Sequence, residues 1–136
     1  MKALRIVLAV VAVVAIAAVV THGSRRIRSK RALDAANRLY EAAETPEELQ
    51  KARQAYQAIL DGGATGAARR LAEAGGASCE AHVAFLEARG RGSVAKHRNA
   101  LEKMKRARDL SGDPQEVWAD RIATFERELK AKLDKM

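Results

Sequence analysis

Four residues with the chemistry of metal ligands or nucleophiles lie close together in the sequence: Cys79, Glu80, His82 and His97. Cys79 and His82 are three residues apart, so on a helix they would share one face, and His97 could approach from another helix. Zinc would need two more good ligands, which leaves a small metal-binding protein as one interpretation. We favour the other interpretation, in which both histidines lie at helix boundaries between core and water.

The sequence holds no arrangement that is typical of an enzyme. A nucleophilic Ser or Cys needs a positioned base, and the chain has 3 histidines, of which His22 follows an apolar N-terminal run. No G-x-S-x-G motif occurs, and no carboxylate pair lies in an apolar stretch that would raise its pKa. The segment 90–93, Gly-Arg-Gly-Ser, lacks the strand and lysine of a phosphate loop and predicts a helix-hairpin turn. We therefore expect neither catalysis nor a cofactor.

A run of basic residues from Arg89 to Arg108 is the candidate binding surface. It contains one acid, Glu102. On a helix beginning at Ser93, most of the basic side chains fall opposite the apolar positions and form a positive outer face. An ordinary solvated face is the alternative to a contact with an acidic protein or anionic lipid headgroups. Nucleic acid is disfavoured because no aromatic residue is interleaved for base stacking. The partner-binding residues that we assign here are Lys96, Arg98, Lys103, Lys105 and Arg106.

The net charge of +8 is concentrated at the N-terminus, where residues 1–31 contain none of the 17 acidic residues. Residues 6–20 are all apolar, and the uncharged stretch continues to Ser24. A helix over residues 6–24 spans about 28 Å, close to the thickness of the hydrocarbon core of a bilayer. The sequence therefore predicts a transmembrane anchor over residues 1–24, a basic juxtamembrane segment over 25–31 and an α-helical soluble domain over 32–136.

A cleaved signal peptide is the alternative interpretation of the same segment, with cleavage after Ala17 or Gly23 and export to the envelope. Five basic residues directly downstream resist translocation and also orient the anchor, because the more positive flank stays in the cytoplasm. We therefore expect a single-pass protein of the inner (cytoplasmic) membrane, with its helical domain in the cytoplasm. The alternative is a periplasmic or secreted domain. The membrane-orienting residues are Arg25, Arg26, Arg28, Lys30 and Arg31.

Helix start and stop signals divide the rest of the chain into five or six short helices without a strand pattern. The first covers residues 26–43. Thr45 and Pro46 begin the second, which Gly62-Gly63 ends. Residues 65–74 form a short helix or loose turn ended by Gly75-Gly76, and Ser78 caps a helix to residue 89. Ser93 caps the next, and the last begins after residue 113. The short connections predict a small bundle of antiparallel helical hairpins.

Inward-facing positions follow from apolar residues at three-to-four spacing. The last helix carries the most: Trp118, Ile122, Phe125, Leu129 and Leu133. Because a thin, alanine-rich core cannot leave such large side chains in water, we expect this helix to cap the fold.

Two helices resemble the second helix of a tetratricopeptide repeat, which carries small and aromatic residues at offsets of four and three. Ala52, Tyr56 and Ile59 show this spacing, as do the residues at 100, 104 and 107. Residues 85–113, with their glycine-rich turn, also resemble Sel1-type repeats. The resemblance implies a helical scaffold that binds a peptide or partner protein in a groove. With the anchor, it indicates a membrane-tethered interaction module, an accessory subunit of a larger membrane-associated assembly.

Overall fold

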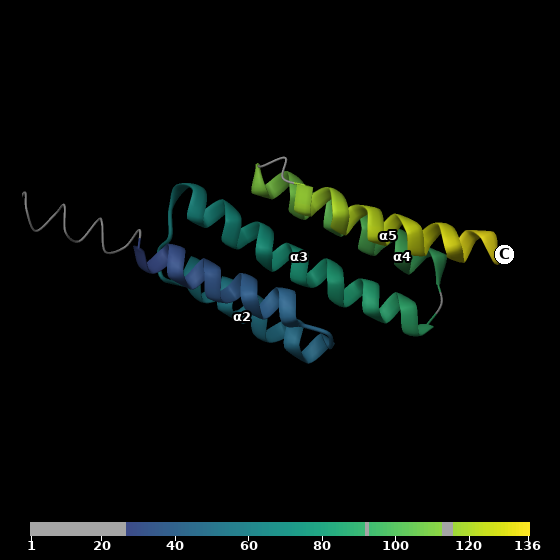
Figure 1. Cartoon of the computed structure of the whole chain (residues 1–136), viewed down its shortest axis with the longest axis horizontal. Helices are drawn as coiled ribbons and strands as arrows, with labels where there is room; N and C mark the ends of the chain where they lie inside the picture. Colours follow the sequence, from purple (N-terminus) through teal and green to yellow (C-terminus); the bar gives the residue numbers. More distant parts are fainter. Residues whose placement is uncertain (1–26, 92, 113–115) are drawn as a thin grey trace, which may run out of the picture.

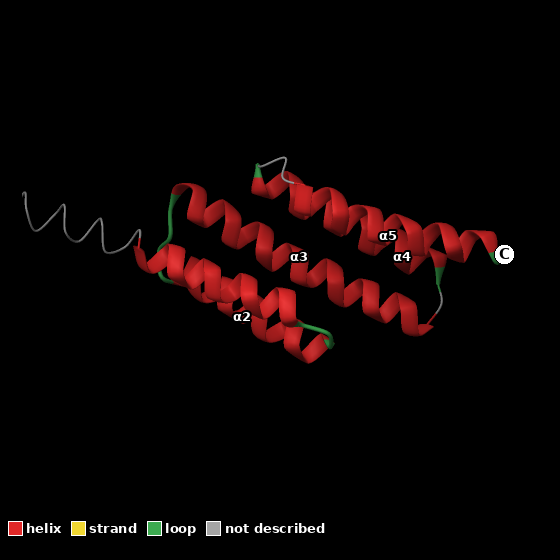
Figure 2. Ribbon diagram, viewed as in Figure 1, coloured by secondary structure: helices red, strands yellow, loops and turns green. Residues whose placement is uncertain are grey.

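The computed structural model describes residues 27–91, 93–112 and 116–136, and these are helical apart from short turns (Figure 2). Residues 27–42 form a first helical segment, followed by α2 (Pro46–Asp61), α3 (Gly66–Arg91), α4 (Val94–Ser111) and α5 (Glu116–Asp134). No strand occurs in these described ranges. The predicted all-α class is therefore confirmed for this part of the chain.

Consecutive helices reverse direction, and α3 runs through the middle of the molecule (Figure 1). It packs against α2 on one side and α4 on the other, and α5 covers α4. Two hydrophobic cores result. The N-terminal core lies between residues 27–42, α2 and α3 and is built around Leu33, Tyr40, Leu49, Tyr56 and Ile59. The C-terminal core lies between α3, α4 and α5 and is built around Phe85, Leu101, Met104, Trp118 and Phe125.

Side-chain caps fix two of the helix starts, as the sequence predicts. Thr45 Oγ1 accepts a hydrogen bond from the Glu48 amide at 3.2 Å, with Pro46 in the first turn of α2. Ser93 Oγ accepts from the Lys96 amide at 3.4 Å at the start of α4. Gly112 ends α4 in the left-handed conformation, with φ of 65°, which only glycine adopts without a steric cost.

The predicted helix break at Gly75-Gly76 is wrong, because α3 is one continuous helix of 26 residues from Gly66 to Arg91. Ser78 is consequently not an N-cap but a fully buried residue inside the helix. The physical reason is tertiary: a Cβ atom at Gly75 would overlap the Tyr56 ring. Gly75 permits a close helix–helix contact here, and packing on both sides outweighs the low helix propensity of the two glycines.

The last helix covers the C-terminal core as predicted. Trp118, Ile122 and Phe125 are buried, and Phe125 stacks on Phe85 with 4.2 Å between ring centroids. Leu133 departs from the prediction, since it is 41% exposed. It lies in the last turn of α5, whose C-terminal end extends past the ends of α3 and α4 (Figure 1).

The predicted anchor over residues 1–24 lies outside the described residues, as do Arg25 and Arg26 and the predicted helix start over 113–115. Among the helices of the described ranges, none combines the length and hydropathy that crossing a bilayer requires. The transmembrane anchor therefore stays a prediction.

Candidate interaction surface

The inner face of α4 is fully used in packing. His97, Ala100, Leu101 and Met104 are buried, and Ala107 continues the same face. Small residues at 100 and 107 let α4 lie close to α3. The basic side chains of α4 are thereby directed outward and have no part in the core.

The five predicted partner-binding residues divide into two rows on this outer surface. Lys96, Lys103 and Arg106 are exposed and fall on one side of the helix, since seven and three residues separate them. We call these three residues the basic stripe. Asn99 and Leu110 complete the row at helical spacing, so the row contains no acid. Among the ion pairs of the described residues, none involves the basic stripe.

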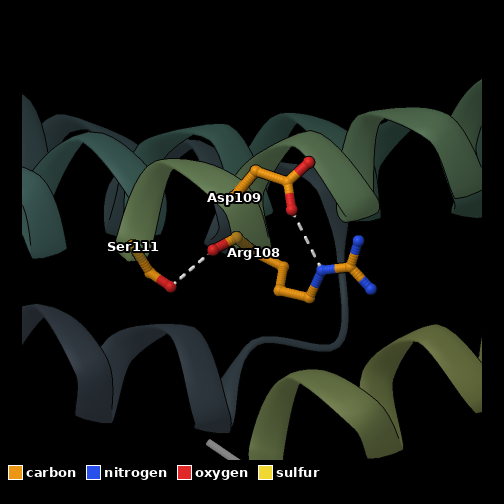
Figure 3. Close-up of polar contacts among 3 residues, drawn as sticks. All are labelled: Arg108, Asp109 and Ser111. Atoms are coloured by element: carbon orange, nitrogen blue, oxygen red, sulfur yellow. Dashed lines mark hydrogen bonds and ion pairs between the residues drawn. The ribbon is translucent and has the colours of Figure 1, made fainter. Parts of the chain in front are cut away.

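The second row alternates in charge: Arg98, Glu102, Lys105 and Asp109 succeed one another at offsets of four, three and four. Lys105 Nζ lies 3.7 Å from Glu102 Oε1. Arg108, beside this row, donates from Nε to Asp109 Oδ1 at 3.2 Å, and Ser111 Oγ donates to the Arg108 carbonyl at 2.6 Å (Figure 3). The positive charge of this row is therefore partly neutralised within α4, whereas the basic stripe has no acidic residue in its row.

Three of the predicted membrane-orienting residues lie in the described part of the chain. Arg28, Lys30 and Arg31 are exposed at the start of the first helical segment. Residue 27 lies at one end of the molecule, together with the turn between α2 and α3 (Figure 1). These charges are thus gathered at the end of the bundle that is nearest in sequence to the predicted anchor.

A chain of polar side chains connects the two cores across α3. Arg121 Nη1 donates to Ser78 Oγ at 3.3 Å, and Ser78 Oγ donates to the Tyr40 hydroxyl at 2.9 Å. The Tyr40 hydroxyl lies 3.1 Å from His82 Nδ1 and donates to it when that nitrogen is unprotonated. The Arg121 guanidinium also lies over the rings of Tyr40 and Trp118, at 4.3 and 5.0 Å from their centroids.

Burial and the positive charge of Arg121 set the pKa values of His82 and Tyr40 in this chain of polar side chains. Burial lowers the pKa of His82, and the neighbouring positive charges of Arg121 and Arg89 lower it further. Burial raises the pKa of the Tyr40 hydroxyl, with Arg121 opposing the rise. Both groups are therefore neutral at physiological pH, which suits a structural hydrogen-bond chain better than proton transfer.

The residues considered for metal binding have other surroundings in the structure. Cys79 is fully buried in the N-terminal core, and burial raises the pKa of its thiol to about 12, which disfavours the thiolate that a metal binds. His97 is 2% exposed and packs against Phe85 beside the C-terminal core. Glu80 pairs with Arg53 at 2.6 Å. Within the described ranges, no three His, Cys, Asp or Glu side chains are grouped as a metal would require.

This chain of hydrogen-bonded polar side chains is not among the features predicted from the sequence. Its signal is the series of small residues to which Ser78 belongs, since Ala74, Ser78 and Ala81 succeed one another at offsets of four and three. Such a series indicates a helix packed closely on two sides, and a hydroxyl within it must then be hydrogen-bonded to another helix. Nothing in the sequence indicates that Arg121 joins these hydrogen bonds, because an arginine in an amphipathic helix is usually solvated.

No protein-family model, curated protein or solved structure matches this chain significantly. The resemblance to tetratricopeptide and Sel1-type repeats therefore stays a prediction from the sequence. Function has to be argued from the surface and the fold themselves.

Proposed function

We propose that the chain is a membrane-tethered helical scaffold that binds an acidic protein partner through the basic stripe of α4. It would act as an accessory subunit of a membrane-associated assembly at the cytoplasmic membrane, with the helical domain in the cytoplasm. The observation that carries the proposal is the row of three exposed, unpaired cations on α4, whose opposite face is fully buried.

The direction of α4 favours a protein over a lipid as the partner of this stripe. α4 lies along the long axis of the molecule, and residue 27 lies at one end of that axis (Figure 1). A bundle that stands upright on the proposed anchor at that end directs the stripe away from the bilayer, and its three cations then do not all reach headgroups together. An acidic protein surface can follow its length, which is about 15 Å from Lys96 to Arg106 at the rise of an α-helix.

Charge reversal of the stripe tests the proposal. We expect Lys96→Glu, Lys103→Glu and Arg106→Glu together to leave helicity and the melting temperature nearly unchanged, because exposed charges contribute little to folding. Crosslinked adducts recovered from native membranes should be lost, and adducts of the original chain should weaken as salt is raised.

The matched control reverses Arg38, Lys51 and Arg127, three exposed cations on three other helices. This variant has the same net charge and should keep its adducts. Adducts that survive reversal of the stripe, or a stripe variant that unfolds, would show that the stripe is only a solvated face.

A further inference from the structure

A pocket of about 630 Å³ lies at the end of the bundle where the described chain begins. Its walls are the start of the first helical segment, the turn between α2 and α3, and the first two turns of α3. The apolar part of its lining consists of Leu33, Leu71 and alanines at 64, 67 and 68. Leu71 is 40% exposed there, so part of an aliphatic side chain is open to a ligand in the pocket.

The charged residues that line the pocket are all basic. Arg28 and Lys30 line it, and no carboxylate does. The first turn of α3 also contains no acidic residue. No ion pair of the described residues involves Arg28 or Lys30. Two uncompensated cations beside an apolar cavity fit a ligand with an anionic group and a hydrocarbon part.

Chain connectivity brings this pocket to the bilayer surface. The uncharged stretch that we propose as the anchor ends at Ser24, four residues before Arg28. Four residues span at most about 14 Å even when fully extended. The exposed Ile27, at 56%, lies on the same end of the molecule. The pocket must therefore lie within the headgroup region or directly beside it.

We propose that this pocket holds one anionic phospholipid of the membrane, an inference that rests on the proposed anchor. The lipid phosphate lies against Arg28 and Lys30, and part of an acyl chain lies against Leu33 and Leu71. A zwitterionic lipid fits less well, because no carboxylate lines the pocket to receive its ammonium group. The bound lipid fixes the bundle relative to the membrane and so sets the direction in which the basic stripe points.

Photocrosslinking of the full chain tests this occupant directly. Photo-leucine replaces Leu71 in protein reconstituted into phosphatidylcholine vesicles, with or without phosphatidylglycerol. The matched control carries photo-leucine at Leu133, which is equally exposed, at 41%, but lies at the other end of the molecule (Figure 1). We expect phosphatidylglycerol adducts at position 71 in excess of the share of that lipid in the bilayer, and no such excess at position 133.

A charge variant then tests the recognition of the phosphate. Ala67→Glu places a carboxylate in the pocket at the second residue of α3, and Ala95→Glu makes the same change at the second residue of α4. Both sites are exposed, so neither variant should lose helicity. Ala67→Glu should lower the phosphatidylglycerol excess at position 71 about fivefold, the effect of one unit charge at an anionic surface. Ala95→Glu should leave the excess unchanged.

Carbonate extraction of the same vesicles separates this inference from the proposed anchor. A chain that resists extraction but shows no phosphatidylglycerol excess, or an excess unaffected by Ala67→Glu, overturns the lipid pocket and leaves the anchor standing. Adducts from position 71 to residues 6–24 or to a second copy of the chain also overturn it, since another occupant then fills the pocket. A chain that carbonate extracts overturns the anchor and the lipid pocket together.

Discussion

Tyr56 lies across the middle of α3, with its ring in the space that a side chain at position 75 would need. The ring is 3% exposed and its hydroxyl donates to Asn37 Oδ1, so it has little freedom to move aside. Gly76, the next residue, has open space at its Cβ position. Two adjacent glycines in one helix therefore have opposite roles, which the sequence alone does not reveal.

Alanine substitution at these two glycines should change stability in opposite directions. Gly75→Ala should destabilise the fold by about 1–3 kcal/mol, the usual cost of overpacking. Gly76→Ala should stabilise it by up to about 1 kcal/mol, since alanine is the better helix former. Chemical denaturation of both variants measures the difference. Equal and favourable shifts would mean that Tyr56 does not pack against α3 as described.

His97 is a second residue whose surroundings set a measurable property. It is 2% exposed and its Nδ1 has no hydrogen-bond partner among the described residues. Burial lowers its pKa, and Lys132 and Arg89 lower it further against the opposing effect of Glu128. The folded state therefore binds a proton less readily than the unfolded state, whose histidine titrates near its ordinary value of 6.5.

Stability should consequently fall with acidification. Above the ordinary pKa both states are neutral, and as the pH drops below about 6.5 the unfolded state gains the proton first, so the free energy of unfolding decreases until the folded pKa is reached. His97→Leu should flatten this profile and raise stability near neutral pH, because it removes an unpaired buried nitrogen. Urea unfolding at several pH values between about 5 and 8 measures the free energy of unfolding of both chains. A variant profile as steep as the original would exclude His97 as the cause, leaving His82.

At the scale of elements, the predictions that hold depend on local chemistry. The starts of α2 and α4 follow from Thr45 and Ser93, whose hydroxyls cap the amides three residues on. The predictions that fail depend on other helices. From the sequence alone, Gly75-Gly76 predicts the end of a helix, because the close contact with Tyr56 cannot be seen there. Ser78 likewise predicts an N-cap, because its hydrogen bonds to Tyr40 and Arg121 join residues far apart in the sequence. The pocket beside Arg28 was likewise beyond prediction, because distant segments form it.

Arg121 connects α5 to the N-terminal core through its contacts with Ser78 and Tyr40. Arg121→Met keeps the aliphatic stem but removes the hydrogen bond to Ser78 and the cation over two rings, so it should cost about 1–2 kcal/mol. The pKa of His82 should rise toward its ordinary value, because the positive charge of Arg121 lowers it. Denaturation and NMR titration of His82 measure the two effects.

Arg127→Met on the same helix is the control, since Arg127 is exposed and, within the described part of the chain, its hydrogen bond is to Thr124, one turn away. It should leave both quantities unchanged. If the pKa of His82 does not respond to loss of Arg121, then Arg121 does not reach across to the polar chain.

At the scale of the whole molecule, positive charges are concentrated in two regions. The end that holds residue 27 carries Arg28, Lys30 and Arg31, and the long side of α4 carries the basic stripe. Since α3 belongs to both cores, the two regions are parts of one packed body. A tether that orients one end of this body therefore also orients the stripe, which makes membrane topology the property on which the proposed function depends.

Replacing Arg25, Arg26, Arg28, Lys30 and Arg31 with Gln should invert the chain or scramble its topology. Lys2 and Arg5 then become the more positive flank, and the positive-inside rule retains that flank in the cytoplasm. A reporter fused after residue 136 measures the change. The control replaces the same number of charges on α4, at Lys96, Arg98, Lys103, Lys105 and Arg106, which lie far beyond the roughly 15–20 residues over which flanking charge acts. An unchanged orientation in the first variant, or an inverted one in the control, would refute the assignment of the juxtamembrane cluster.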